Sequence, residues 1–231
     1  MNMPKIYLSP AAHGRDNPCG YDSACGENIH CNLYMDELEP YLLACGFAVK
    51  RNPKDRTGDR LKEAIAESNA WGADLHYVAH TNAGGGAYSL LMVYDQGTAY
   101  GYAEKLAARR REIYAGNVKI SVQPQWDELR LTAAPAVYDE MVFHDNAKDI
   151  AWFHEHLREM AEATAKAICD MFGAAFVDPY AKPAEPAPEP ESGGDVWYRV
   201  QVGAFREKAN ADRLCAELQG KGYAAFVKAG A

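Results

Sequence analysis

Residues 74–82 read DLHYVAHTN, and residues 84–86, which follow closely, are all glycine. The run at residues 75–80 is short, rich in apolar and β-favouring side chains, and bounded by a glycine loop, which is typical of a buried strand. Open α/β proteins place their reactive groups at the carboxyl ends of such strands. His80 is therefore the first candidate functional residue, although a histidine at this place also commonly makes a structural hydrogen bond.

Strands and helices alternate on both sides of this run. Further strands are predicted at residues 5–8, 47–50, 88–94 and 135–143. Apolar residues at three- and four-residue spacing predict helices at residues 27–45, 61–71, 96–111 and 149–172. This alternation predicts an α/β fold, a mostly parallel twisted sheet with helices on both faces, over residues 1–174.

The composition changes after residue 174. Residues 178–191 read DPYAKPAEPAPEPE and hold five of the twelve prolines. Such a segment is extended and solvated, so residues 175–194 are predicted to form a linker. Residues 195–231 are predicted to form a small βαβ unit, which is too short to bury much of a core by itself. We expect this unit to need a partner or to be half of a larger structure.

Composition limits the classes of partner. The net charge of −8 and the pI near 5.4 argue against a nucleic-acid-binding surface. No apolar run is long enough to span a bilayer, and residues 1–10 do not resemble a secretory signal. We therefore expect synthesis in the cytoplasm and no membrane partner. The six cysteines are interpreted mainly as free thiols, with a disulfide among Cys19, Cys25 and Cys31 left open.

His13, Glu27 and His80 are each predicted at the end of a strand or the start of the next helix. All three can lie along one edge of the sheet, and two imidazoles with one carboxylate form the His₂Glu set that binds catalytic zinc. Glu140, near the end of another strand, can accept a proton from a water molecule at that site. Spacing alone does not single out this set, because the ligands lie far apart in the sequence.

Other histidines compete for these roles. His76 lies roughly 13 Å back from His80 along the strand at about 3.3 Å per residue, so it cannot reach the same ion. His30, three residues after Glu27 on one helix face, is the rival ligand. His144 follows the strand of Glu140 and lines the cleft or makes a structural hydrogen bond.

Four motifs, in order, resemble one family. AAHGRD (residues 11–16) follows the opening strand, and GEN (residues 26–28) begins a helix. ADLHYVAHTNA (residues 73–83) and PAVYDEMVFHDN (residues 135–146) complete the set. Over residues 6–172 the chain resembles the zinc-dependent N-acetylmuramoyl-L-alanine amidases of the amidase 3 family.

The resemblance implies one Zn²⁺ per chain, bound by His13, Glu27 and His80, with Glu140 as the catalytic carboxylate. It also implies peptidoglycan as substrate, cut by a zinc-activated water between N-acetylmuramic acid and the L-alanine of the stem peptide. Two positions depart from the family pattern, since alanines precede His13 and Ala64 stands near an expected arginine. Two alternatives remain open, a zinc peptidase that cuts within the stem peptide and a non-catalytic wall-binding protein.

The tail resembles a second family. WYRVQVGAF (residues 197–205) and the helix after it are similar to the first half of a sporulation-related (SPOR) repeat, a domain that binds glycan strands. Either a second half is missing or two copies complete each other's sheet as a homodimer. Asn82, His144 and Gln201 are candidates for substrate contact. An enzyme of this kind without a signal peptide is expected to reach the wall by release, as an endolysin or a mother-cell autolysin does.

Overall fold

The computed structural model describes residues 3–12, 19, 21, 26–53, 61–181 and 200–228. The chain divides into two compact units, Met1–Lys182 and Pro183–Ala231. No helix among the described residues is both long and apolar enough to cross a membrane. The predicted boundaries at residues 174 and 194 stay a prediction.

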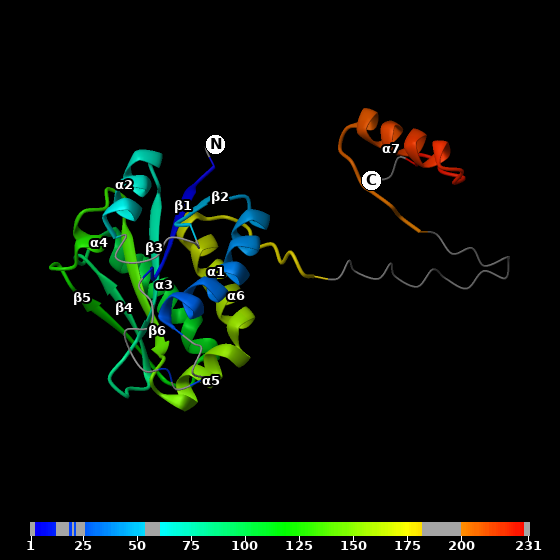
Figure 1. Cartoon of the computed structure of the whole chain (residues 1–231). Helices are drawn as coiled ribbons and strands as arrows, with labels where there is room; N and C mark the ends of the chain where they lie inside the picture. Colours follow the sequence, from blue (N-terminus) through cyan, green and yellow to red (C-terminus); the bar gives the residue numbers. More distant parts are fainter. Residues whose placement is uncertain are drawn as a thin grey trace. The chain divides into compact units, whose positions relative to one another are not determined.

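The first unit is built on a six-stranded sheet in the order β2-β1-β3-β6-β4-β5 (Figure 1). β1 runs parallel to β2 and β3, β3 to β6, and β4 to β5, whereas β4 is antiparallel to β6. The predicted α/β fold with a mostly parallel sheet is therefore confirmed. The strands are β1 (Lys5–Pro10), β2 (Ala48–Arg51), β3 (Leu75–Asn82), β4 (Tyr88–Val93), β5 (Asn117–Val122) and β6 (Ala136–Phe143).

The reversal of β4 follows from the loop that precedes it. Only residues 83–87 separate β3 from β4, and parallel neighbours need a crossover of a dozen residues or more. Gly84 and Gly85 have φ angles of 117° and 71°, in the positive-φ region that residues with a side chain rarely adopt. The chain can therefore turn back within a few residues, and β4 enters the sheet beside β6.

Helices cover both faces of the sheet, as predicted (Figure 1). α1 (Glu27–Ala44), α3 (Thr98–Ile113) and α6 (Leu157–Phe172) pack on the face with the main core. α2 (Leu61–Trp71) and α4 (Asp127–Arg130) lie on the other face, where Glu67 and Glu128 contact side chains of β1 and β3. The single helix predicted for residues 149–172 is instead α5 (Ala147–Glu155) followed by α6, because His156 leaves the helical conformation with φ −114° and ψ 20°.

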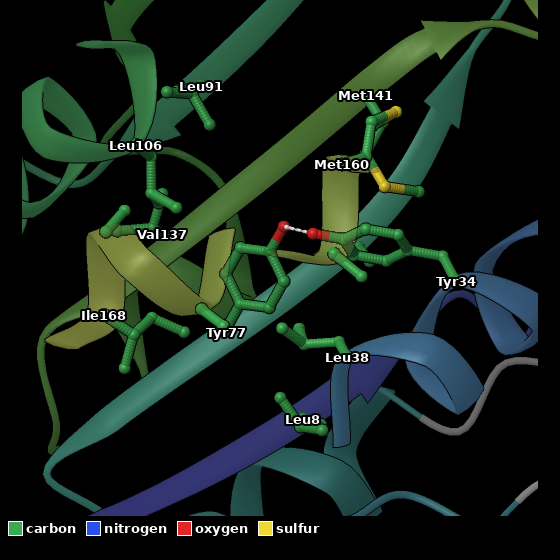
Figure 2. Close-up of a cluster of buried hydrophobic side chains, with 14 of the residues drawn as sticks. Leu8, Tyr34, Leu38, Tyr77, Leu91, Leu106, Val137, Met141, Met160 and Ile168 are labelled. Atoms are coloured by element: carbon green, nitrogen blue, oxygen red, sulfur yellow. Dashed lines mark hydrogen bonds between the residues drawn. The ribbon is translucent and has the colours of Figure 1, made fainter. Parts of the chain in front are cut away.

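The central strand β3 distributes its side chains between the two faces. Leu75, Tyr77 and Ala79 enter the main core, whereas His76 and His80 point to the opposite face, as the two-residue period of a strand requires. Figure 2 shows Tyr77 among the apolar side chains of the core, with its hydroxyl bonded to that of Tyr34 at 3.1 Å. The main core thus fixes β3 from one side and leaves its other face for polar side chains.

The second unit contains one helix among its described residues, α7 (Lys208–Gly220), and none of the residues of this helix is buried. The flanking residues 200–206 and 223–228 form neither helix nor strand, so the strands predicted on both sides of α7 are wrong for the described residues. A strand needs a hydrogen-bonded neighbour, and the described part of this unit provides none. Val200 and Phe226 remain 87% and 76% exposed as a result.

Candidate active site

His80 and Glu27 meet at the carboxyl end of β3. Glu27 is the first residue of α1, and its Oε1 lies 2.8 Å from Nδ1 of His80, with both side chains buried. The N-terminus of a helix favours a negative charge, which accounts for a carboxylate at this position. The fold brings these two predicted ligands together across 53 residues of sequence.

Glu140 lies beside His80 on the neighbouring strand. The two residues are register partners in the parallel pair of β3 and β6, and neighbouring strands are about 4.8 Å apart. Glu140 is 9% exposed, and its Oε2 has no hydrogen-bond partner among the described residues. The site therefore holds a buried carboxylate oxygen that is available for another ligand or for a proton.

Burial and charge shift the titration of both residues. Burial lowers the pKa of His80, but the hydrogen bond and charge of Glu27, together with the charge of Glu140, outweigh it, so the net shift is upward. Burial raises the pKa of Glu140 to about 7, with His80 opposing the rise and Glu27 adding to it. The environment thus favours a protonated, positively charged group at His80 and a neutral group at Glu140.

His13 lies outside the described residues, as does most of the AAHGRD motif. Within the described part of the chain, no group of three or more His, Cys, Asp or Glu residues is arranged to hold a metal ion. The donor set nevertheless fits a metal, since an imidazole nitrogen and a carboxylate oxygen face each other beside the buried Oε2 of Glu140. The predicted ligand role of His13 stays a prediction.

The other candidates take different places. Oδ1 of Asn82 accepts the N–H of Ala83 at 2.8 Å, within the loop after β3. His144 is 2% exposed, and its Nδ1 lies 2.9 Å from Oγ1 of Thr81. Gln201 is exposed in the second unit. Their roles in binding substrate stay predictions.

The competing histidines are bonded elsewhere. Nε2 of His76 lies 2.9 Å from Oε1 of Glu128, which also accepts the hydroxyl of Ser9. His30 contacts Cys19 through Nε2 and His154 through Nδ1, at 3.4 and 3.1 Å. Both ring nitrogens of His30 thus have close contacts other than Glu27 and His80.

Two aromatic residues next to the site were not predicted. The ring of Tyr138 stacks on the ring of His80 at 4.5 Å, and Trp126 packs edge-on against Tyr138 at 4.9 Å. Tyr138 is two residues before Glu140 on the same strand, so the period of the strand already puts the two on one face. Trp126, in the loop after β5, gave no such signal.

The cysteines resolve part of the open question about a disulfide. Cys19 is disulfide-bonded, whereas Cys31 is free and buried in the main core. Burial, with the charge of Glu27 next, raises the pKa of the Cys31 thiol well above its ordinary value. Cys31 is thus an apolar core residue rather than a partner of Cys19.

An α/β sheet that gathers an imidazole and two carboxylates at the edge of neighbouring strands is the kind of site found in metal-dependent hydrolases. N-acetylmuramoyl-L-alanine amidase CwlM of Bacillus licheniformis is 30% identical over 182 residues, which cover 74% of this chain and 64% of that protein. A sporulation-specific N-acetylmuramoyl-L-alanine amidase of Bacillus subtilis is 28% identical over 234 residues, covering 97% of this chain and 84% of that protein.

Solved structures agree on the fold. The crystal structure of an N-acetylmuramoyl-L-alanine amidase from Clostridium difficile superposes with a TM-score of 0.65 at 15% identity, over 75% of this chain and 98% of that one. The two relatives confirm the resemblance of the chain to N-acetylmuramoyl-L-alanine amidases, and such homologues imply a catalytic metal. Residues 162–229 match the SPOR domain, a range that begins within α6 and extends through α7.

Proposed function

We propose that this chain is a zinc-dependent amidase that hydrolyses the bond between N-acetylmuramic acid and the L-alanine of the peptidoglycan stem peptide. The observation that carries the proposal is the juxtaposition of Glu27 and His80 beside the register partner Glu140. The relatives named above carry this activity in their names.

Zinc fits the donors on chemical grounds. It binds imidazole nitrogen and carboxylate oxygen, and catalytic sites supply three protein ligands with the fourth position open. His80 and Glu27 would supply two ligands, and His13 is proposed as the third. Glu140 lies in the same cluster, and its Oε2 has no hydrogen bond among the described residues, so this oxygen is proposed to exchange a proton with water.

The metal and the residues around it have separate roles in the proposed reaction. When bound, the metal polarises the scissile carbonyl and lowers the pKa of a water molecule. Glu140 accepts the proton of the attacking water at Oε2 and delivers it to the nitrogen of the departing amine. Because the carboxyl of Glu140 is buried and its pKa is raised towards neutrality, it can both take up and release a proton near neutral pH. Tyr138, stacked on His80, limits the movement of that imidazole.

Mass spectrometry of digested peptidoglycan tests the reaction. The proposal expects intact stem peptides with a free L-alanine amine. Shortened stem peptides would favour the alternative, a zinc peptidase, which uses the same site chemistry. Elemental analysis should find one zinc per chain, lost in His80→Ala, and chelation should stop the reaction. Full wall-clearing activity in Glu140→Ala would overturn the role given to Glu140, and an absence of any activity in wild type would favour a wall-binding protein.

The second unit is proposed to bind glycan strands and to join two copies of the chain. Support comes from the match to the SPOR domain and from the exposed apolar residues on both sides of α7, among them Val200 and Phe226. Light scattering of the full chain should give the mass of a dimer, and a chain that ends at Gly173 should give a monomer. A monomer mass for the full chain would rule out the dimer.

We also propose that the protein is made in the cytoplasm and acts on the wall after release, as an endolysin or a mother-cell autolysin does. The support is the proposed wall substrate, together with the sporulation-specific amidase of Bacillus subtilis among the relatives. Fractionation of producing cells before and after lysis tests it. Protein found outside intact cells would contradict it.

A further inference from the structure

The pairing of β3 with β6 becomes irregular directly after the site. His80 pairs with Glu140, but the next matched pair is Asn82 with Phe143. Between these two pairs β6 advances by three residues and β3 by two, so β6 contains one extra residue. Such a bulge bends the strand and re-aims groups near functional sites. Here it coincides with Thr81, the residue between His80 and Asn82.

Thr81 uses its backbone to hold Glu27. The N–H of Thr81 donates to Oε1 of Glu27 at 3.0 Å, the same oxygen that faces Nδ1 of His80 at 2.8 Å. Glu27 is 6% exposed, and a buried carboxylate is costly unless hydrogen bonds satisfy it. The direction of the Glu27 carboxylate therefore depends on where the backbone of Thr81 lies.

His144 fixes Thr81 from the other side. Its Nδ1 lies 2.9 Å from Oγ1 of Thr81 and 3.1 Å from the carbonyl oxygen of the same residue. A carbonyl oxygen can only accept, so Nδ1 carries the hydrogen. The backbone N–H of His144 also donates to the carbonyl of Asn82 at 2.9 Å. His144 thus binds two successive residues of β3 at the bulge.

A second tether holds the loop beyond. The N–H groups of Gly84 and Gly85 both donate to Oδ2 of Asp145, at 2.7 and 2.9 Å. His144 and Asp145, which follow β6, therefore hydrogen-bond the end of β3 and the loop after it at several places. Within this described segment, the side-chain contacts to Thr81 given above come from His144.

We infer that His144 is a positioning residue, which acts through Thr81 to aim the carboxylate of Glu27 at the site. This inference rests on the proposed function only for its consequence, tighter metal binding. Groups that orient a metal ligand typically contribute about 10–100-fold to metal affinity. At 2% exposure, His144 is placed for this role rather than for contact with substrate.

Two substitutions of His144 distinguish the effect of its Nδ1 hydrogen-bond donor from the effect of its side-chain volume. His144→Asn can keep a donor near the place of Nδ1, whereas His144→Leu keeps bulk and loses the donor. Zinc affinity, measured by competition with a chromophoric chelator, should fall about 10–100-fold in His144→Leu and stay near wild type in His144→Asn. Thr81→Val and Thr81→Ser form a second pair at the other end of the contact, which keeps the test open if His144→Leu does not fold.

His156 supplies the matched control. Its Nδ1 also bonds a backbone carbonyl, that of Trp152 at 2.9 Å, but this contact lies at the C-terminal end of α5 and does not involve Glu27. His156→Leu should therefore leave zinc affinity unchanged. Unchanged affinity in folded His144→Leu, or an equal loss in His156→Leu, would overturn the inference.

Hydrogen exchange of the Thr81 amide in the metal-free protein gives a readout that does not depend on the proposed function. Exchange should be faster in His144→Leu than in wild type or His144→Asn, because the backbone of Thr81 is then held less firmly and its N–H bond to Glu27 opens more often. If wild type binds no zinc, the proposed function fails while this measurement still tests the positioning role. Equal exchange rates in all three proteins would contradict that role.

Discussion

The ion pair of Arg110 and Asp139 is buried in the core beneath the site, and breaking it should be costly. Nη2 of Arg110 in α3 lies 2.7 Å from Oδ2 of Asp139 in β6, and the two side chains are 2% and 0% exposed. Ser89 and Tyr77 complete the group, since the Ser89 hydroxyl accepts from Arg110 and the Tyr77 hydroxyl donates to Asp139. Burial lowers the pKa of Arg110, but the charge of Asp139 outweighs it and the net shift is upward, so the guanidinium stays charged.

Arg110→Met would remove the cation and leave the carboxylate of Asp139 buried. Of the four side chains in this group, Tyr77 would still donate a hydrogen bond to that carboxylate. Removing one partner of a buried ion pair costs about 3–5 kcal/mol. For a unit of this size, each kcal/mol lowers Tm by about 2–4 °C, so Tm should fall by roughly 6–20 °C. Asp139 is adjacent to Glu140 on β6, so the loss should also reduce activity well below the unfolding temperature.

Urea unfolding followed by circular dichroism measures the change in the free energy of unfolding. Arg109→Met is the matched control, because Arg109 is the neighbouring arginine and pairs with Asp170 at the surface, where such pairs contribute about 0–1 kcal/mol. Combining Arg110→Met with Asp139→Asn should cost less than the sum of the single changes, by about 0.5–3 kcal/mol. A cost below about 1 kcal/mol for Arg110→Met would refute the reasoning.

Two further predictions concern pH and substrate. Burial raises the pKa of Asp149 above its ordinary value of 3.8, with the hydrogen bond from Tyr114 opposing the rise. The fold thus favours the protonated form, so this group's contribution to stability is present below that value and is lost as the pH rises through the folded pKa. In unfolding titrations, wild type should lose stability relative to Asp149→Asn over that rise, and parallel curves would contradict this. Trp126 is 36% exposed and packs on Tyr138 beside the site. Trp126→Ala should raise KM about two- to tenfold with little change in kcat, whereas Leu131→Ala, another exposed apolar residue, should change neither. An equal effect of both changes on KM would contradict a substrate contact at Trp126.

The parts of the fold that periodicity encodes could be predicted. A run of apolar and β-favouring side chains with a following glycine loop places β3, and the parity of that strand separates Tyr77 in the core from His80 on the other face. The direction of β4 could not be predicted in this way, because a strand's own pattern does not state which strand it will pair with. The break between α5 and α6 was not predicted either, because the helical spacing of apolar residues continues on both sides of His156 and does not mark the break.

Some residues of the candidate site could be predicted from the sequence, and others could not. Glu27, His80 and Glu140 could be selected because each stands at the start or end of an element and matches a family motif. The bulge at Thr81 could not, because it depends on one extra residue of β6 that leaves no mark on the composition of either strand. Trp126 was missed because it stands in a loop, where no period relates a residue to a face.

The two carboxylates of the site offer the sharpest separation of roles. Glu27→Gln and Glu140→Gln are matched changes, since each keeps the size of a buried side chain and removes one ionisable group. Glu27 has Oε1 engaged by the N–H of Thr81 and by His80, an arrangement suited to a fixed ligand. Glu140 leaves Oε2 without a hydrogen bond among the described residues, which suits a group that takes and gives a proton.

Glu27→Gln should therefore lose zinc and activity together, because a neutral amide is a poor ligand compared with a carboxylate. Glu140→Gln should keep zinc near one per chain and still lose about 10²–10⁴-fold in kcat, the usual contribution of a general acid–base group. Elemental analysis of each dialysed variant, paired with rates on purified peptidoglycan, makes the comparison. Equal loss of zinc in both variants would show that both carboxylates bind the metal, and it would leave the proton transfer to another residue.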